Sequence, residues 1–98
     1  MKNKNWIVYI IHFNEPYKHA KHYTGITNDF YLRMKAHLKG KGAKLPYIVL
    51  KSGIGMKFFI WKNNLNFKEA KKEEKRIKKV IKNTARICKY CKQKKYFS

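Results

Sequence analysis

The sequence predicts a small α/β domain of the α+β type, in which helices flank a three-stranded antiparallel sheet in the order strand, strand, helix, helix, strand, helix. Two observations support this fold class. Short runs of β-branched and aromatic residues are followed by segments whose apolar residues recur with helical spacing. With 98 residues, 44% of them hydrophobic, the chain can bury one modest core and has no room for a second.

The first two strands are expected at residues 6–11 and 22–26. Residues 6–11 are apolar at both odd and even positions, which is typical of a central strand buried on both faces. Residues 12–21 are mostly polar and contain a proline, so they predict a long connection between the strands. The resulting hairpin places Tyr9 and Tyr23 on neighbouring strands.

The first helix is expected to begin at residues 27–29, where Thr-Asn-Asp provides an N-cap and a carboxylate in the first turn. Arg33 and His37 are four residues apart and therefore share one stripe of this helix. The neighbouring stripe should face the core and consists of Phe30, Met34 and Leu38.

The remaining elements follow the same patterns. A glycine-containing basic loop at residues 40–42 ends the first helix, and a shorter helix is expected from about Pro46 to Gly53. Residues 58–61 predict the third strand. The last helix begins near residue 67, and its inner face should consist of Phe67, Ala70, Ile77 and Ile81.

The charge of the chain predicts its partner. It contains 25 Lys+Arg against 5 Asp+Glu, a formal net charge of +20, which attracts polyanions and repels other copies of the chain. Nucleic acid is therefore the expected partner, and a monomer is favoured. A membrane surface would call for an amphipathic helix or a lipidation signal, and we find neither. The apolar run at residues 6–11 is too short for a signal peptide or a membrane span, so we expect a cytoplasmic protein.

Two tyrosine triplets and two later charged residues predict chemistry. Ile7-Val8-Tyr9 and Tyr23-Thr24-Gly25 are followed by Arg33 on the first helix and by glutamates on the last one. Two phenols, a guanidinium and a carboxylate are the groups needed to hydrolyse a phosphodiester with one metal ion. Taken singly, Tyr9 and Tyr23 could be ordinary strand aromatics and Arg33 a solvated cation. Their order along the chain favours a site.

This order resembles the GIY-YIG nucleases, specifically their small stand-alone members. The resemblance covers residues 6 to about 79 and includes Thr-Asn-Asp at residues 27–29, then Arg33, His37 and a late glutamate. The chain departs from the family name where Ile7 replaces glycine and Thr24 replaces isoleucine; both positions serve the backbone and packing. Some members also have a basic residue where this chain has Ile26.

The resemblance implies an endonuclease that cuts DNA with Mg²⁺ or Mn²⁺, with RNA as the alternative substrate. Tyr9 or Tyr23 would accept the proton of the attacking water, with Tyr9 preferred, although a tyrosine of pKa about 10 needs cationic neighbours for this. Arg33 would bind the scissile phosphate through its planar fork. His37 is expected at the same site, as an orienting residue more than as a ligand.

Only five carboxylates could hold the metal ion. Glu15 lies in the predicted connection, Asp29 is explained by the helix start, and Glu69 falls off the apolar stripe of the last helix. Glu73 and Glu74 flank that stripe on opposite sides, and periodicity does not separate them. In the family pattern, an alanine, a glutamate and a lysine follow one another at intervals of four residues. This pattern matches Ala70, Glu74 and Lys78, and it implies that Glu74 is the metal ligand.

Lysines are expected to bind the phosphate backbone without reading sequence. We expect residues 1–84 to form the nuclease-like domain and residues 85–98 a basic tail without regular structure that carries a Cys-x-x-Cys pair. The predicted phosphate-binding residues are Lys71, Lys75, Lys78 and Lys79 on the last helix, and Lys89, Lys92, Lys94 and Lys95 in the tail.

Cys88 and Cys91 are expected to be reduced thiols that anchor the tail. Structural zinc at this pair is a less favoured alternative, because zinc needs four ligands and no second Cys pair exists. Histidines among His12, His19, His22 and His37 could complete such a site, but their spacing is not that of a zinc finger. A redox pair is disfavoured because the βαβ context is absent. Two other functions therefore remain open: a non-catalytic nucleic-acid binder on the same fold, and a zinc-stabilised interaction module.

Overall fold

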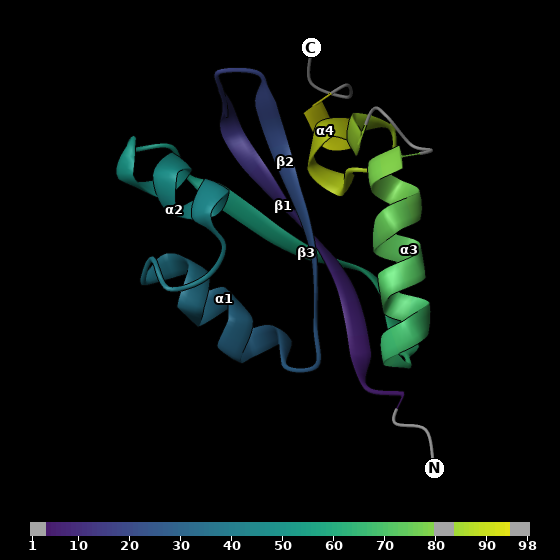
Figure 1. Ribbon diagram of the computed structural model, residues 1–98. Coiled ribbons are helices and arrows are strands. Elements are labelled where there is room, and N and C mark those ends of the chain that lie inside the picture. The colour runs from purple at the N-terminus through teal and green to yellow at the C-terminus, as the bar shows by residue number, and fades with distance from the viewer. Residues whose placement is uncertain (1–3, 80–83, 95–98) are drawn as a thin grey trace.

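Figure 1 shows the computed structural model, in which a three-stranded antiparallel sheet is packed between helices. It describes residues 4–79 and 84–94. The elements in chain order are β1 (Trp6–Tyr17), β2 (Ala20–Thr27), α1 (Phe30–Leu38), α2 (Lys44–Lys51), β3 (Met56–Leu65), α3 (Phe67–Lys79), a 3-10 turn η1 (Thr84–Arg86) and α4 (Lys89–Lys94). The predicted fold class and the order of the first six elements are confirmed.

Strand β1 is the central strand, in the sheet order β2-β1-β3. Its side chains alternate between two buried faces. Tyr9, Ile11 and Phe13 pack with residues of α1 and α2, while Val8 packs with Ala70 of α3 on the other face. In Figure 1, α1 and α2 lie on one side of the sheet and α3 and α4 on the other. Burial on both faces explains why residues 6–11 of the strand are apolar at every position.

The β1–β2 hairpin is longer than predicted. Residues 12–21 were expected to form a long connection, but the strands continue through them to a turn at residues 18–19, where Lys18 has a φ of 56°. The reason is the third strand: His12 and Phe13 are buried and pair with β3, so the backbone of β1 stays in the ladder beyond residue 11.

Helix α1 begins as predicted, because the Asp29 carboxylate accepts a hydrogen bond from the Leu32 N–H at 3.0 Å. The predicted inner stripe is correct for Met34, which is buried, and wrong for Leu38, whose exposure is 53%. His37 takes the inner position instead, with an exposure of 1%. Met34 and His37 are three residues apart and share the buried face of the helix, so the last turn presents His37 and not Leu38 to the sheet.

The two glycines expected to end α1 and α2 do so in the left-handed region. Gly40 has a φ of 76°, and the Lys41 N–H donates to the Ala36 carbonyl at 2.8 Å. Gly53 has a φ of 83° after α2. Both conformations are ones that glycine adopts without a steric penalty.

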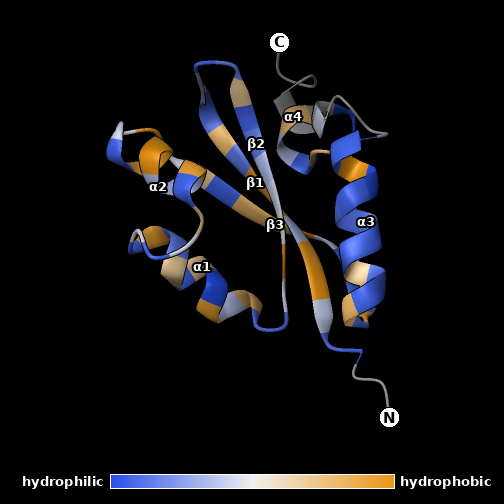
Figure 2. Cartoon of the chain, in the orientation of Figure 1, coloured by the Kyte–Doolittle hydropathy of each residue, from blue (hydrophilic) through white to orange (hydrophobic). Residues whose placement is uncertain are grey.

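Helix α3 lies along the sheet with few apolar positions. Figure 2 shows it as a largely hydrophilic helix. Ala70 and Ile77 are buried as predicted, whereas Phe67 is half exposed and meets the Trp6 ring edge-on at 4.8 Å. Ile81 lies outside the described residues. None of the helices in the described ranges is long and apolar enough to span a membrane.

The segment after Thr84 is ordered into η1 and α4, where no regular structure was predicted. Tertiary contacts account for this. Cys88 is fully buried, and the Tyr90 hydroxyl donates to the Phe58 carbonyl of β3 at 3.3 Å. Contacts with the sheet therefore hold a segment whose sequence has no helical period of its own.

Candidate active site

A tyrosine on the central strand is joined to a histidine on α1. The Tyr9 hydroxyl lies 2.9 Å from Nε2 of His37, and both side chains are buried. Nδ1 of His37 is buried and has no hydrogen-bond partner among the described residues. This contact fixes the positions of two predicted site residues that are 28 positions apart in the chain.

Two glycines make room for this pair. Gly25 lies opposite Tyr9 in the β1–β2 ladder, and a Cβ at Gly25 would lie 2.5 Å from the Tyr9 hydroxyl oxygen. A Cβ at Gly42 would overlap Nδ1 of His37. The glycine of the Tyr-Thr-Gly triplet is therefore required because the phenol of Tyr9 packs directly over the backbone of β2.

Tyr23 completes an aromatic cluster around His37. The His37 ring lies 5.8 Å from the ring centre of Tyr9 and 5.8 Å from that of Tyr23. The two tyrosine rings are 6.4 Å apart. Tyr9 is 2% exposed, whereas Tyr23 is half-buried and lines an opening next to α3. The two phenols thus share one site but differ in their access to solvent.

The charges of Arg33 and Glu74 affect the pKa of both phenols. Burial raises the pKa of Tyr9, with Tyr23 and Glu74 adding to this, while the Arg33 guanidinium lowers it. Burial also raises the pKa of Tyr23, and there Glu74 has a larger effect than Arg33. At Tyr9 the order is reversed, because Arg33 outweighs Glu74. Both phenols are therefore protonated near neutral pH, and Tyr9 is the one at which the cation has a larger effect than the carboxylate.

His37 is held neutral. Burial lowers its pKa, and the positive charge of Arg33 lowers it further. A neutral imidazole has one N–H, and an unpaired buried donor is less tolerated than an unpaired acceptor. The tautomer with the proton on Nε2 leaves only the Nδ1 acceptor without a partner and directs an N–H at the Tyr9 oxygen.

Three of the five acidic residues have structural roles. Asp29 caps α1. Glu69 forms a capping box at the start of α3: its carboxylate accepts from the Asn66 N–H at 2.9 Å, and its own N–H donates to Asn66 Oδ1 at 2.7 Å. Glu73 accepts from Trp61 Nε1 at 2.8 Å.

Glu73 is held by further partners. Arg76 contacts it with two nitrogens, at 2.9 and 2.7 Å, and Lys62 lies 3.5 Å away. Hydrogen bonding by Arg76, helped by Trp61 and the charge of Lys62, lowers the pKa of Glu73 to about 2. This carboxylate is an ion-pair residue between α3 and β3. The alternative that periodicity left open, Glu73 as the metal ligand, is therefore disfavoured by its partners.

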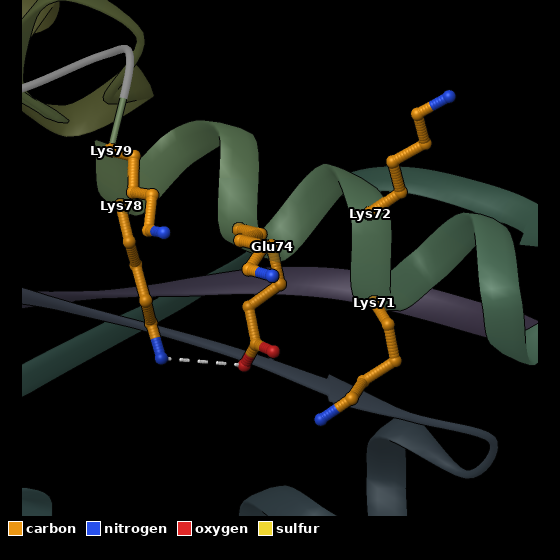
Figure 3. Close-up of a pocket in the computed structure, with 6 residues that line it drawn as sticks. Lys71, Lys72, Glu74, Lys78 and Lys79 are labelled. Atoms are coloured by element: carbon orange, nitrogen blue, oxygen red, sulfur yellow. Dashed lines mark hydrogen bonds and ion pairs between the residues drawn. The ribbon is translucent and has the colours of Figure 1, made fainter.

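Glu73 faces Trp61 of β3, whereas Glu74 lies on the side of α3 that faces β2. Its single partner within the described ranges is Lys78, whose Nζ lies 3.5 Å from the carboxylate. Lys78 Nζ also lies 6.0 Å from the ring centre of Tyr23, so this side of α3 reaches the edge strand β2. Figure 3 shows Glu74 and Lys78 pointing to the same side of the helix. Glu74 is thus the carboxylate on the side of the two tyrosines.

Lysines surround this carboxylate. An open pocket of about 500 Å³ on α3 is lined by six residues, five of them basic. The predicted residues Lys71, Lys75, Lys78 and Lys79 line it together with Glu74; Lys72, which the sequence analysis missed, also lines it. Lys72 could have been found from its spacing to Lys75 and Lys79, at i+3 and i+7.

Lys89, whose side chain is the one described among the predicted basic residues of the last segment, does not line this pocket. Lys89 is exposed on α4, with its Nζ 5.8 Å from the Tyr90 ring centre. Lys92 and Lys94 belong to α4, but their side chains lie outside the part of the structure that is described, as does all of Lys95. Their contribution to binding stays a prediction.

The departures from the family pattern are explained by packing. Ile7 is partly buried against the cluster around Tyr9, and Thr24 is buried. Ile26 packs with Val8 on the opposite face of the sheet. A basic side chain next to the second tyrosine is supplied instead by Lys78 of α3.

A second group of functional side chains was not predicted as a unit. His12, His22, Cys88 and Cys91 bring their ligand atoms within 4.8 Å of one another on the face opposite Tyr9. The sequence signal was weak, because two ligands come from neighbouring strands and two from a distant helix. His12 and His22 were two of the four histidines expected as candidates to complete a zinc site; the other two, His19 and His37, lie outside the group.

Comparison with known proteins identifies the family of the chain. A family model described as the GIY-YIG catalytic domain matches residues 5–90, nearly the whole chain. No curated protein and no solved structure matches. On the strength of the family match, the chain belongs to the GIY-YIG family, whose catalytic domain implies nuclease activity on a nucleic acid.

Proposed function

We propose that the protein is a divalent-metal-dependent endonuclease that hydrolyses phosphodiester bonds in DNA. The observation that carries this proposal is one shared site: Tyr9 and Tyr23 pack around His37, and Lys78 links Tyr23 to Glu74. Arg33 and Glu74 lie near enough for their charges to act on the pKa of both phenols. A cation, a carboxylate and two hydroxyls that influence one another in this way form the set of groups that hydrolysis of a phosphodiester requires.

Glu74 is the residue that would hold Mg²⁺ or Mn²⁺. Its carboxylate is a hard oxygen donor with no strong protein partner among the described residues, and its side chain is 18% exposed, which leaves room for water and a phosphate oxygen. One carboxylate together with substrate phosphates is a common way to bind Mg²⁺. When bound, the metal would stabilise negative charge on the leaving oxygen.

Tyr9 is the preferred general base. A base is most effective when a third group orients it, and of the two tyrosine hydroxyls only that of Tyr9 has a side-chain hydrogen bond within the described residues. An N–H on Nε2 of His37 would stabilise the phenolate form, as would the charge of Arg33. His37 is then a positioning residue that acts through Tyr9.

Arg33 would bind the scissile phosphate. It is exposed on α1, four residues before His37, and its charge is felt by both tyrosines. The planar guanidinium can donate two parallel hydrogen bonds to phosphate oxygens and can stabilise charge that develops there. The lysines of the α3 pocket would hold adjacent phosphates and contribute no base readout.

A non-catalytic nucleic-acid binder on the same fold is the second candidate. The observation in its favour is that burial raises the pKa of both tyrosines, so that neither is a base at neutral pH in the protein alone. The chain would then use its charge of +20 and the lysine pocket for binding only.

A cleavage panel separates the two candidates. Purified protein is incubated with plain duplex, branched and single-stranded DNA and with RNA, each with Mg²⁺, with Mn²⁺ or with EDTA. The nuclease proposal expects metal-dependent cuts in at least one DNA substrate and none with Glu74→Gln, whose folding and DNA binding are measured alongside and should match the wild type. Binding of every substrate without cleavage in either metal would support the second candidate.

A further inference from the structure

A cluster of two histidines and two cysteines joins the hairpin to the last helix. His12 of β1 and His22 of β2 are direct partners in the ladder, with ring centres 5.4 Å apart. Cys88 precedes α4 and Cys91 lies within it. The cluster sits on the face of the sheet that packs against α3 and α4, so it is separate from the site around Tyr9 and His37.

The distances within the cluster match a tetrahedral metal site. Nδ1 of His12 lies 3.3 Å from Cys88 Sγ and 3.5 Å from Cys91 Sγ, and Nε2 of His22 lies 3.3 Å from Cys91 Sγ. All four ligand atoms are within 4.8 Å of one another. Zinc bonds of about 2.3 Å to sulfur and about 2.0 Å to nitrogen give a tetrahedral N to S edge of about 3.5 Å. The ligand atoms therefore surround a point suited to one ion.

Hydrogen bonds account poorly for this convergence. Nδ1 of His12 can donate one proton or accept one, yet both cysteine sulfurs lie within 3.5 Å of it. A thiol is in any case a weak donor. A cation at the centre, by contrast, interacts favourably with every lone pair at once.

The surroundings suit a closed structural site. Cys88 is fully buried and His12 is 5% exposed, while His22 and Cys91 are partly exposed and leave a path for the ion to enter. The Cys91 backbone N–H points at Cys88 Sγ from 3.4 Å and would stabilise a thiolate there.

The donor set selects the metal. Two thiolates and two neutral imidazoles are soft to borderline ligands that favour zinc in a tetrahedral geometry and disfavour Mg²⁺. Two thiolates also balance the double charge of the ion. The cluster contains no carboxylate, so it differs in kind from the oxygen donor of Glu74.

We propose that His12, His22, Cys88 and Cys91 bind one structural Zn²⁺ that fastens α4 to the β1–β2 hairpin. The two thiols lose their protons to solvent as they bind, and no cysteine is oxidised. The link joins residues that are 76 positions apart, so it closes most of the chain into a loop and restricts the unfolded state. It would also hold the basic last segment against the sheet.

Metal content gives the direct test, and its readout does not depend on nuclease activity. The full chain is purified from zinc-supplemented medium, passed over a desalting column and analysed by elemental mass spectrometry. We expect about one zinc per chain in the wild type. We expect loss of most of this zinc in Cys91→Ser and in His22→Gln. The matched control is His19→Gln, an exposed histidine in the turn next to the cluster, which should keep its zinc.

Wild-type protein alone answers the question if the variants do not fold. After removal of metal by a chelator, Co²⁺ should produce the intense visible absorption of a tetrahedral cobalt thiolate site. The melting temperature should fall in the chelator and recover with Zn²⁺ but not with Mg²⁺. Three results would each overturn the proposal. They are a folded wild type that takes up no zinc from an equimolar solution, a purified protein that contains iron in place of zinc, and a Co²⁺ spectrum that lacks thiolate bands.

Discussion

The Tyr9 hydroxyl and Nε2 of His37 lie 2.9 Å apart in the core, which couples the central strand to α1. For catalysis, it means that Tyr9, the proposed base, is oriented by α1, the helix that also carries Arg33. The contact has a consequence for stability as well. Removal of the phenol oxygen leaves Nε2 of a buried histidine without its partner.

We expect Tyr9→Phe to reduce the single-turnover cleavage rate by about 10²-fold or more, the usual contribution of a general base. It should destabilise the fold by about 1–3 kcal/mol, because Nε2 of the buried His37 loses its partner. The matched variant is Tyr23→Phe, which removes a half-buried hydroxyl that has no side-chain hydrogen bond within the described ranges. A larger loss in Tyr23→Phe than in Tyr9→Phe would reverse the assignment of the base.

Arg33→Lys should cleave poorly although the charge is kept. A lysine ammonium is a point donor and cannot make the planar two-pronged contact with phosphate. The measurement is the cleavage rate at saturating protein, beside a fluorescence-anisotropy measurement of DNA affinity. A rate loss below about tenfold, or about 1.4 kcal/mol, would show that Arg33 is only a solvated cation.

Glu74→Ala should abolish cleavage and leave DNA affinity unchanged or slightly higher, since one negative charge is removed from a lysine-lined pocket. Lys78 loses its 3.5 Å partner, a contact between partly exposed groups whose loss costs little stability. Glu73→Gln is the matched control and should keep its cleavage activity. If Glu74→Ala cuts at the wild-type rate, the proposed metal site is wrong.

Glu73→Gln should instead destabilise the fold, by about 1–2 kcal/mol at neutral pH, because Trp61 and Arg76 lose an ionised acceptor. The effect should depend on pH. The pKa of Glu73 is lowered from 4.5 to about 2 in the folded protein, so its contribution is present above pH 4.5 and is lost as the pH falls towards 2. Urea unfolding at several pH values should show the wild type and the variant converging in this range. A constant difference between them would contradict the assigned pKa.

The lysine pocket should determine the salt dependence of binding. Each phosphate contact to duplex DNA contributes about −0.9 to the slope of log affinity against log salt. Lys75→Gln with Lys79→Gln should therefore flatten the slope by up to about 2. The control is Lys44→Gln with Lys51→Gln on α2, which removes the same charge outside the pocket. Equal changes in both double variants would show that total charge, and not the pocket, sets the affinity.

Local sequence determined most of the fold of this protein. The run at residues 6–11 is apolar at every position, which predicted a central strand, and β1 is the central strand. The N-cap of α1 and the glycines after α1 and α2 were predictable because capping and positive φ angles depend on neighbouring residues alone. The two tyrosines, Arg33 and His37 could be named for the same reason, from their order and spacing on these elements.

Long-range packing decided what periodicity left open. Glu73 and Glu74 are equivalent on a helical wheel, and only the docking of α3, with Trp61 on one side and Tyr23 on the other, distinguishes them. The length of β1 depended on a partner strand more than 40 residues later in the chain, which the polar residues 12–21 did not indicate.

The same holds for the last segment, whose sequence has no helical period yet forms α4. The convergence of His12, His22, Cys88 and Cys91 results from strand register and from the docking of a distant helix. Neither is encoded by local spacing, because contacts between residues 76 positions apart depend on the whole fold. The sequence alone therefore determined the fold class, the order of the first six elements and the candidate tyrosine site. Only the tertiary structure decided the length of the hairpin and the formation of α4, and it brought the four sulfur and nitrogen ligands together.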